Sequence, residues 1–208
     1  MKDYEALSRK HFDGQAAQYD ARDTVYYSRE GKISCRDIAA LLKDRAYEKL
    51  LDVGCGTGFL LDLLAKQHPG EYAGLDLSEN MIREAERKQI PGASFTVGSA
   101  NQLPYGDETF DIVTCSQSFH HYPYPEQAIG EARRVLKKGG IYILSDTGIG
   151  GFGAWLDNHI FFRLMRSGDC HTRNRKGIEN LMRRCGFEIV DSRQISGMIY
   201  TVTGKKAD

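Results

Sequence analysis

The sequence lacks the cysteine pattern of a disulfide framework or a structural zinc site. Its five cysteines are odd in number, and no two of them form a Cys-x-x-Cys pair; they are Cys35, Cys55, Cys115, Cys170 and Cys185. Disulfide scaffolds and zinc sites depend on paired, regularly spaced cysteines. We therefore expect reduced, mostly structural thiols and no metal ligands among them.

Net charge and long apolar runs are also missing. The 208 residues carry 28 basic and 28 acidic side chains, so net charge does not favour nonspecific binding to nucleic acid or to a membrane surface. No stretch approaches the roughly 18 apolar residues of a membrane span, and the N-terminus has no apolar core typical of a secretory signal. We expect one domain in the cytoplasm, without a nucleic-acid partner, as a monomer or a homodimer.

The central part of the chain alternates between strand and helix patterns. Short buried strands are predicted at residues 49–53, 71–75, 93–97, 109–115 and 141–146. Helical patterns lie between them, at 59–66, from Ser78 as N-cap to Lys88, and from Pro125 to the glycines at 139 and 140. This alternation predicts an α/β fold with a parallel sheet covered on both faces.

The two ends of the chain depart from this alternation. Residues 4–20 have a helical pattern, an irregular stretch follows, and a second helix is predicted at about 33–46. After a helix near 174–184, two strand patterns are joined by a turn at Ser196-Gly197. We interpret this pair as a hairpin, so the sheet is expected to end with an antiparallel strand.

Three glycines follow the first predicted strand at every second position. The stretch LLDVGCGTGFL contains Gly54, Gly56 and Gly58, with Asp52 two residues before the first of them. Glycine lets the backbone approach a ligand closely, and the helix that follows points free N–H groups at an anion. The dinucleotide-binding pattern G-x-G-x-x-G does not fit, because Phe59 stands where its third glycine would be. A tight turn without a ligand is the alternative.

Asp76 makes the ligand hypothesis more specific. It ends the second predicted strand, 18 residues after Gly58. A carboxylate at that place can accept two hydrogen bonds from the neighbouring hydroxyls of a ribose. The alternative is a solvated strand end, or a cap of the helix that begins after Ser78. Together, the glycine loop and Asp76 predict a nucleoside ligand that has free ribose hydroxyls and an anionic part.

Several segments resemble one known family in the expected order. They are LDVGCGTGFL, GLDLSENMI, GSANQLPYGDETFDIV, SFHHYPYPEQAIGEARRVLKKGGIYILSD and the closing GFEIV…YTVTGKK. The chain resembles the class I S-adenosylmethionine-dependent methyltransferases over about residues 45–204. It is most similar to the small-molecule branch of the methyltransferase-11 type, which includes quinone-biosynthesis C-methyltransferases.

The resemblance implies a fold, a domain division and a reaction. The fold is a Rossmann-like, doubly wound sheet with strand order 3-2-1-4-5-7-6 and an antiparallel strand 7. Residues 1–45 would form an N-terminal helical lid, and residues 46–208 the cofactor-binding domain, with a substrate-side insertion at about 147–172. The enzyme would transfer a methyl group from S-adenosyl-L-methionine to a small-molecule acceptor and release S-adenosyl-L-homocysteine.

The resemblance also implies roles for individual residues. Asp52 and the loop Gly54, Cys55, Gly56 and Gly58 would hold the methionine part of the cofactor, together with Ser116 and Gln117. Asp76 would bind the ribose, Leu77 would lie against the adenine, and Tyr19 would close over the cofactor. Family members often carry an acidic residue where this chain has Ser99. The backbone of Ala100, or Asn101, would then serve the adenine amine instead.

The residues that act on the acceptor are less specified by the sequence. Methyl transfer needs a general base only if the acceptor must lose a proton, and His120 or His121 could serve, unless both are structural. Tyr26, Phe152 and Trp155 are candidates for receiving a flat apolar acceptor. The alternative for the aromatic insertion is packing against the sheet or a second subunit. No metal site is expected, because His159, Cys170 and His171 match no standard ligand spacing.

Three other functions stay open at this point. Phe59 disfavours an NAD-dependent oxidoreductase. A noncatalytic S-adenosylmethionine-binding protein is possible because methyl transfer requires no particular catalytic residue. An RNA methyltransferase would use the basic stretch between Arg163 and Arg184, although such stretches are usually solvated surface.

Overall fold

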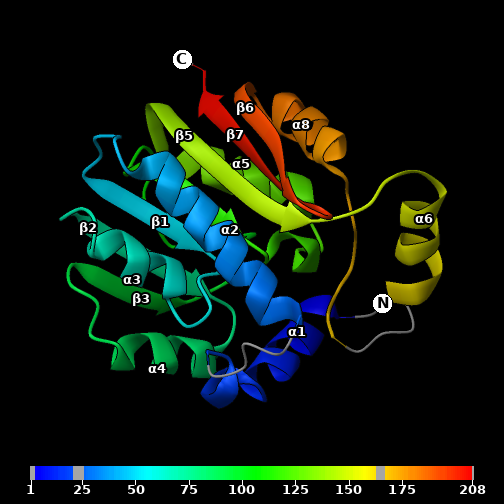
Figure 1. Ribbon diagram of the computed structural model, residues 1–208, viewed down its shortest axis with the longest axis horizontal. Coiled ribbons are helices and arrows are strands. Elements are labelled where there is room, and N and C mark those ends of the chain that lie inside the picture. Colours follow the sequence, from blue (N-terminus) through cyan, green and yellow to red (C-terminus); the bar gives the residue numbers. More distant parts are fainter. Residues whose placement is uncertain (1–2, 21–25, 163–166, 208) are drawn as a thin grey trace.

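A single seven-stranded sheet forms the centre of the molecule in the computed structural model, which describes residues 3–20, 26–162 and 167–207 (Figure 1). The strand order is β3-β2-β1-β4-β5-β7-β6, and only β7 runs antiparallel to its two neighbours. The strands are β1 (Lys49–Val53), β2 (Glu71–Asp76), β3 (Ala93–Val97), β4 (Phe110–Ser116), β5 (Leu136–Thr147), β6 (Phe187–Ser196) and β7 (Ile199–Lys206). The expected fold class and strand order are confirmed.

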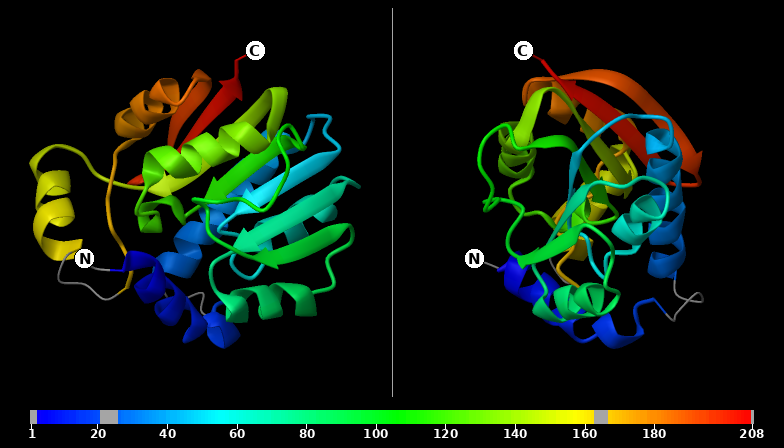
Figure 2. Two further views of the ribbon diagram at one scale, coloured as in Figure 1. Left: turned by 180° about the vertical axis from the view of Figure 1, so that it is seen from behind. Right: turned by 90° about the vertical axis from the view of Figure 1, so that its left-hand side faces the viewer.

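Helices cover both faces of this sheet. They are α1 (Tyr4–Asp13), α2 (Tyr26–Leu42), α3 (Phe59–Ala65), α4 (Glu79–Arg87), α5 (Pro125–Val135), α6 (Gly151–Leu156) and α8 (Arg175–Arg184), with short helical turns η1 (Ala16–Gln18), η2 (Phe119–His121) and η3 (Asp157–Phe161). Helices α2 and α3 pack on one face of the sheet and share a core with it. Helices α5 and α8 pack on the opposite face (Figure 2).

The alternation of side chains along the inner strands separates the two cores. Leu50 on β1 and Ile112 on β4 face α2 and α3, whereas their neighbours Leu51 and Val113 face α5. All four are fully or almost fully buried. Because successive side chains of a strand point to opposite faces, a continuous apolar run of this kind is typical of a parallel sheet covered on both sides.

Helix α2 begins and ends earlier than the sequence pattern predicted. The expected helix at about 33–46 is observed as Tyr26–Leu42, so part of the stretch expected to be irregular is helical. Ile38 and Leu42 are buried in the core beneath α2. Burial of this face supplies the stabilisation that the local sequence lacks. Helix α2, which lies within the residues 1–45 expected to form a lid, therefore contributes to one of the two cores of the sheet.

The junction of α5 and β5 also differs from the prediction. The helix was expected to continue to Gly139 and Gly140, but it ends at Val135, and β5 begins at Leu136. Leu136 pairs with Phe110 across an irregularity in the β4 register, and its side chain is completely buried. The local pattern alone does not end the helix at Val135. Strand pairing and burial of Leu136 determine where it ends.

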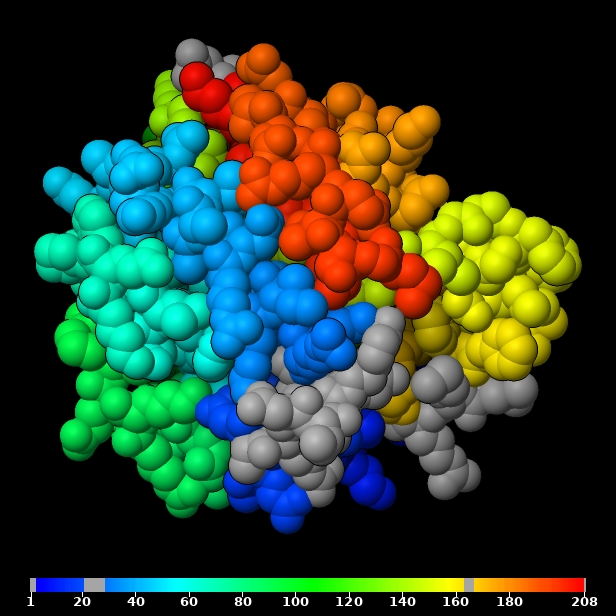
Figure 3. All heavy atoms as spheres, in the orientation of Figure 1, coloured from blue at the N-terminus to red at the C-terminus, as the bar shows by residue number. Residues whose placement is uncertain are grey.

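Two segments lie outside the layered body. Helix α1 and η1 lie beside α4, below the sheet in Figure 1. Helix α6 and η3 form an arm that stands apart from the sheet and appears as a separate lobe in Figure 3. None of the described helices combines the length and apolar character needed to cross a bilayer.

Candidate functional site

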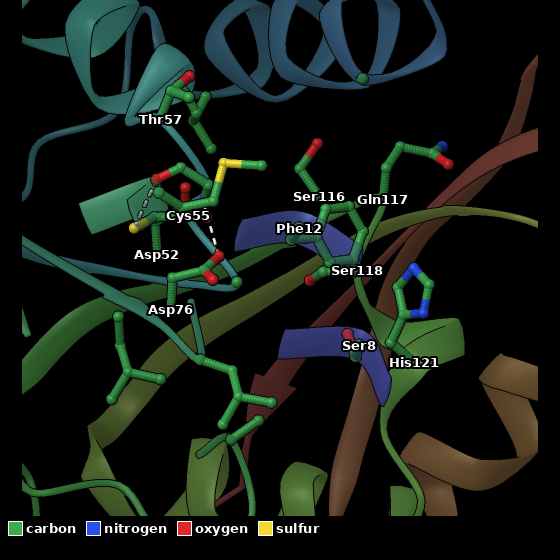
Figure 4. A pocket seen from close by; sticks show the side chains of 18 of the residues that line it. Ser8, Phe12, Asp52, Cys55, Thr57, Asp76, Ser116, Gln117, Ser118 and His121 are labelled. Atoms are coloured by element: carbon green, nitrogen blue, oxygen red, sulfur yellow. Dashed lines mark hydrogen bonds between the residues drawn. The ribbon is translucent and has the colours of Figure 1, made fainter. Parts of the chain in front are cut away.

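A cavity opens where the carboxyl ends of β2, β1 and β4 meet the N-terminal helix. It is lined by the loop after β1, the ends of β2 and β3, the segment after β4, and α1 (Figure 4). Of the residues predicted to hold the cofactor, those that line this cavity are Tyr19, Asp52, Gly54, Cys55, Gly56, Asp76, Leu77, Ser99, Ala100, Ser116 and Gln117. Gly58 does not: it is the residue before α3 and packs against Ile90 and Phe95.

The glycine loop is held tightly against its neighbours. The backbone N–H groups of Gly54 and Cys55 both donate to the carbonyl of Leu75 at the end of β2, at 2.7 and 3.0 Å. Gly54 has a φ of 74°, and a Cβ at this position would lie 2.2 Å from Ser118 Oγ. Glycine is therefore required here because both the backbone conformation and the space exclude a side chain.

Asp76 joins the glycine loop to the end of β2. Its Oδ2 accepts the Gly56 N–H at 2.8 Å, and its Oδ1 accepts the Ser78 N–H at 2.9 Å (Figure 4). Burial raises the pKa of this carboxyl above its usual value, while the backbone hydrogen bonds oppose the shift. Each carboxylate oxygen can accept a second hydrogen bond, so Asp76 can hold hydroxyl groups in the cavity as well as the loop.

Asp52 is a second buried carboxyl in the same cavity. It is 2% exposed, and its Oδ1 accepts the Thr114 hydroxyl at 2.8 Å. Burial raises its pKa to about 7, although the bond from Thr114 acts in the opposite direction. A cation bound beside Asp52 would favour the charged form and compensate for the loss of solvent.

The segment after β4 supplies the wall opposite Asp76. Gln117 has a φ of 51°, which is uncommon for a residue other than glycine. Its side-chain Nε2 donates to Ser34 Oγ on α2, and its Oε1 accepts the Thr147 hydroxyl of β5, each at 2.9 Å. These two bonds fix the Gln117 amide beside the cavity.

The two candidate histidines occupy different environments. His121 lines the cavity, whereas His120 bonds to Asp146, with His120 Nδ1 2.7 Å from Asp146 Oδ1. Burial opposes protonation of His120, but the charges of Asp146 and Asp169 outweigh burial and raise its pKa to about 9. Burial and the neighbouring His120 lower the pKa of His121. His120 is therefore a cation in a structural ion pair, and His121 is neutral.

Asp169 brings a further carboxylate to this pair. Its Oδ1 lies 3.7 Å from His120 Nε2 and 3.8 Å from His121 Nδ1. Ligand atoms of these three side chains lie within 4.8 Å of one another, which is the spacing of a potential metal site. A protonated His120 between Asp146 and Asp169 already balances part of the carboxylate charge, so a metal ion is not needed to explain the cluster.

The N-terminal segment closes one side of the cavity. Tyr19 lines it, and burial raises the pKa of the Tyr19 hydroxyl to about 12. The Phe12 ring makes edge contacts with Tyr19 and His121, at centroid distances of 6.4 and 5.1 Å. Asp20 accepts the Thr57 hydroxyl of the glycine loop at 2.7 Å. The segment thus contacts the loop and the β4 end together.

Helix α1 contributes residues that the sequence analysis did not identify. Glu5, Ser8 and Phe12 line the cavity, and Glu5 Oε1 accepts hydrogen bonds from Ser99 and Asn101. Their spacing of three and four residues places them on one face of the helix. This periodicity was visible in the sequence, but nothing in it indicated that the face meets the β3 loop.

The predicted acceptor residues do not line the cavity in this structure. Phe152 is 76% exposed and Trp155 is 50% exposed, and their rings stack on each other on the arm, 5.8 Å apart. Tyr26 begins α2, but its side chain lies outside the described part of the structure. The expectation that Phe152 and Trp155 border a pocket is therefore not met in the described residues, because α6 stands away from the sheet.

Known proteins resemble this chain in both sequence and fold. A family model described as a methyltransferase domain matches residues 51–144. A demethylmenaquinone methyltransferase of Alkalihalophilus pseudofirmus is 29% identical over 211 residues, which cover 89% of each chain. A phthiotriol/phenolphthiotriol dimycocerosates methyltransferase of Mycobacterium ulcerans is 37% identical over 101 residues, which span only 37% of that protein and 48% of this chain.

The fold has a solved counterpart of nearly the same extent. It is a putative methyltransferase in complex with the Trm112 methyltransferase activator of Haloferax volcanii. The TM-score is 0.82 with 18% sequence identity, and the match covers 97% of this chain and 98% of the other. At this identity the similarity supports the arrangement of the elements and nothing finer.

Proposed function

We propose that the chain is a class I S-adenosylmethionine-dependent methyltransferase that binds this cofactor in the cavity beside the glycine loop and methylates a small organic molecule. The observation that carries the proposal is the convergence of the glycine loop, Asp76, the β3 loop and the β4 end on one cavity. Ligands of doubly wound sheets bind at this carboxyl edge.

The residues present fit the chemical groups of the cofactor. Asp76 would accept the ribose hydroxyls with the lone pairs that Gly56 and Ser78 leave free. Asp52 would compensate the charge of the amino group, and that charge would in turn favour the ionised carboxylate against the effect of burial. Leu77 would lie against the base. When bound, S-adenosylmethionine supplies an electrophilic methyl group attached to a sulfonium sulfur.

The chain contributes mainly positioning to the reaction. Alignment of a donor and an acceptor can supply most of the rate acceleration when the donor is already activated. His121 borders the cavity and is the candidate proton acceptor, but burial lowers its pKa, which makes it a weak base near neutral pH. The site therefore suits an acceptor whose attacking atom is nucleophilic without strong base catalysis.

We assign the acceptor to the class of small, largely apolar molecules. The relative that matches along most of its length is named for a demethylmenaquinone substrate, and this supports a ring-containing acceptor. The balanced charge of the chain favours such a molecule over a nucleic acid.

Calorimetric titration tests the cofactor part of this proposal. S-adenosylmethionine and S-adenosylhomocysteine are expected to bind with micromolar affinity, and NAD is expected not to bind. Asp76→Ala should abolish binding, and Asp76→Asn, which keeps one acceptor oxygen for Ser78, should weaken it while preserving the fold. Binding of NAD in place of the two sulfur nucleosides would contradict the proposal.

The acceptor class needs a separate measurement. The protein is incubated with S-adenosylmethionine carrying a radiolabelled methyl group, once with a metabolite extract and once with bulk RNA. Label in an extractable small molecule is the expected outcome. Label retained on RNA would overturn the acceptor class and leave the cofactor assignment intact.

A further inference from the structure

Glu5 reaches from α1 to the loop after β3, across more than ninety positions of sequence. Its Oε1 accepts the Ser99 hydroxyl at 2.7 Å and the Asn101 side-chain N–H at 3.0 Å. Glu5, Ser99 and Ala100 all line the cavity. A carboxylate from the N-terminal helix therefore stands beside the β3 loop, where the loop itself supplies a hydroxyl and an amide but no carboxylate.

The order of the strands shows which part of a ligand meets Glu5. From the centre of the sheet outward, the cavity passes the glycine loop after β1, Asp76 at the end of β2, and Ser99 after β3. If Asp76 holds a ribose, the base of the nucleoside extends either toward β3 or toward β4. The β4 side is occupied by Ser116, Gln117 and His121 (Figure 4). The base thus lies at the β3 end, beside Glu5.

The hydrogen-bonding groups at the β3 end favour a ligand that donates. Ser99 gives its hydroxyl proton to Glu5 and accepts the Asn101 backbone N–H at 3.1 Å. Both described bonds to Glu5 use Oε1, and none of the described residues donates to Oε2. An ionised carboxylate can only accept. This end of the cavity therefore matches a base that presents an N–H group there.

We propose that Glu5 selects adenine by accepting a hydrogen bond from its exocyclic amine. The proposal rests on the proposed function, because it assumes that an S-adenosyl ligand occupies the cavity. A base that carries a carbonyl at the same position would place an acceptor against the carboxylate, which is unfavourable. Helix α1 is thereby part of the recognition of the cofactor as well as a cover over it.

A purely structural role for Glu5 has a different consequence. If Glu5 only fastens α1 to the β3 loop, its loss weakens every ligand of the cavity to the same extent. If Glu5 contacts the base, its loss weakens the adenine ligand more than a ligand that lacks the amine. The ratio of two affinities therefore separates recognition from fastening, even where a variant loosens α1.

The experiment compares S-adenosylhomocysteine with S-inosylhomocysteine, in which a carbonyl replaces the amine, by calorimetry. The wild-type chain is expected to prefer the adenosyl ligand by roughly 100-fold, because the inosyl ligand loses a hydrogen bond to a charged group. The preference should fall below about tenfold in Glu5→Ala and to an intermediate value in Glu5→Gln. Glu79→Gln, which changes an exposed carboxylate on α4, should leave the preference for the adenosyl ligand unchanged.

A rescue variant keeps the test decisive if Glu5→Ala binds both ligands weakly. Glu5→Ala combined with Ser99→Asp returns a carboxylate from the β3 loop itself, so the adenosyl preference should recover. An unchanged ratio in Glu5→Ala overturns the role of Glu5 while the proposed function stands. Failure of the wild-type chain to bind either ligand overturns the proposed function and the role of Glu5 together.

Discussion

The space around Gly54 is smaller than a methyl group. A Cβ at this position would lie 2.5 Å from Ser118 Cβ and 2.8 Å from the Tyr122 hydroxyl, with the backbone at a φ of 74°. By contrast, a Cβ on Gly56 would meet nothing within 4 Å, although its φ of 52° is also positive. The two glycines share a left-handed backbone conformation, in which a residue with a Cβ would be strained, but they differ in the room for a side chain.

We therefore expect Gly54→Ala to lower the free energy of unfolding by about 3 kcal/mol or more, because strain and overpacking act together. Gly56→Ala should cost only about 1 kcal/mol, from backbone strain alone. Urea unfolding of both variants measures the difference. Equal losses would show that the contact of Gly54 with Ser118 is not what limits this position.

Asp52 makes the affinity for the cofactor depend on pH. Its pKa of about 7 reflects burial in the free protein. A ligand that carries an ammonium group binds the ionised carboxylate better, so binding should release a proton below pH 7. The affinity for S-adenosylhomocysteine should rise about tenfold between pH 6 and pH 8 and then level off.

Calorimetry across this pH range, in buffers of different ionisation enthalpy, measures both the affinity and the released proton. Asp52→Asn should bind weakly and show no such dependence. The histidines beside the cavity do not interfere, because the pKa of His120 is about 9 and that of His121 is lowered. An affinity that is constant from pH 6 to pH 8 in the wild-type chain would contradict the role of Asp52.

At the scale of elements, α1 is fastened to the start of α4 by polar contacts. Asp13 Oδ1 accepts the Ser78 hydroxyl at 2.6 Å and the Asn80 N–H at 3.3 Å, at the start of α4. Ser8 is the buried residue of this helix. Loss of these polar contacts should make local opening of α1 easier, because they fasten its C-terminal end.

Asp13→Ala should consequently loosen α1 without unfolding the sheet. Amide hydrogen exchange in residues 4–18 is expected to become several-fold faster, while peptides from α4 stay protected, since Ser78 still caps Met81. Removal of the exposed Glu86 carboxylate by Glu86→Ala is the matched control. Equal exchange of α1 in both variants would show that Asp13 does not fasten it.

The arm formed by α6 and η3 differs from α1 in the contacts that hold it. Its large apolar side chains are exposed, namely Phe152, Trp155, Ile160 and Phe161. Stacking among Phe152, Trp155 and His159 orders the arm locally. The arm therefore depends little on the sheet, whereas α1 is tied to it through Glu5 and Asp13.

For the molecule as a whole, His120 links stability to pH. Its pKa is about 9 in the folded protein, against an ordinary value of 6.5. A group with a raised pKa stabilises fully below its unfolded value, and this contribution is lost as the pH rises through the folded value. The raised pKa of Asp52 also makes stability fall as the pH rises, but this fall is complete near pH 7. The change in the free energy of unfolding between pH 7 and pH 9 therefore belongs mainly to His120.

The free energy of unfolding should thus fall between pH 7 and pH 9, by up to about 3 kcal/mol over the complete titration of His120. Asp146→Asn removes the closest carboxylate, 2.7 Å from the ring, and should make the profile nearly flat in this range. Urea unfolding at several pH values gives both profiles. A fall of the same size in the variant would mean that Asp146 does not hold the proton on His120.

Local patterns in the sequence were sufficient for most of the elements. Ser78 was predicted as an N-cap, and it accepts the Met81 N–H. The short apolar runs of the strands and the positions of Pro125 and Gly197 mark boundaries through interactions within a few residues. The strand order came from the resemblance to a known family. Boundaries failed at α2 and β5, where burial against distant strands outweighs the local pattern.

The sequence by itself determined the fold class, the glycine loop and the carboxylates Asp52 and Asp76, because each depends on residues close together in the chain. Only the tertiary structure decided that Glu5 meets Ser99, that His120 pairs with Asp146, and that Phe152 is exposed and does not line the cavity. These facts follow from the path of the chain, which joins residues tens of positions apart. No local periodicity encodes such contacts, because they depend on how complete elements pack.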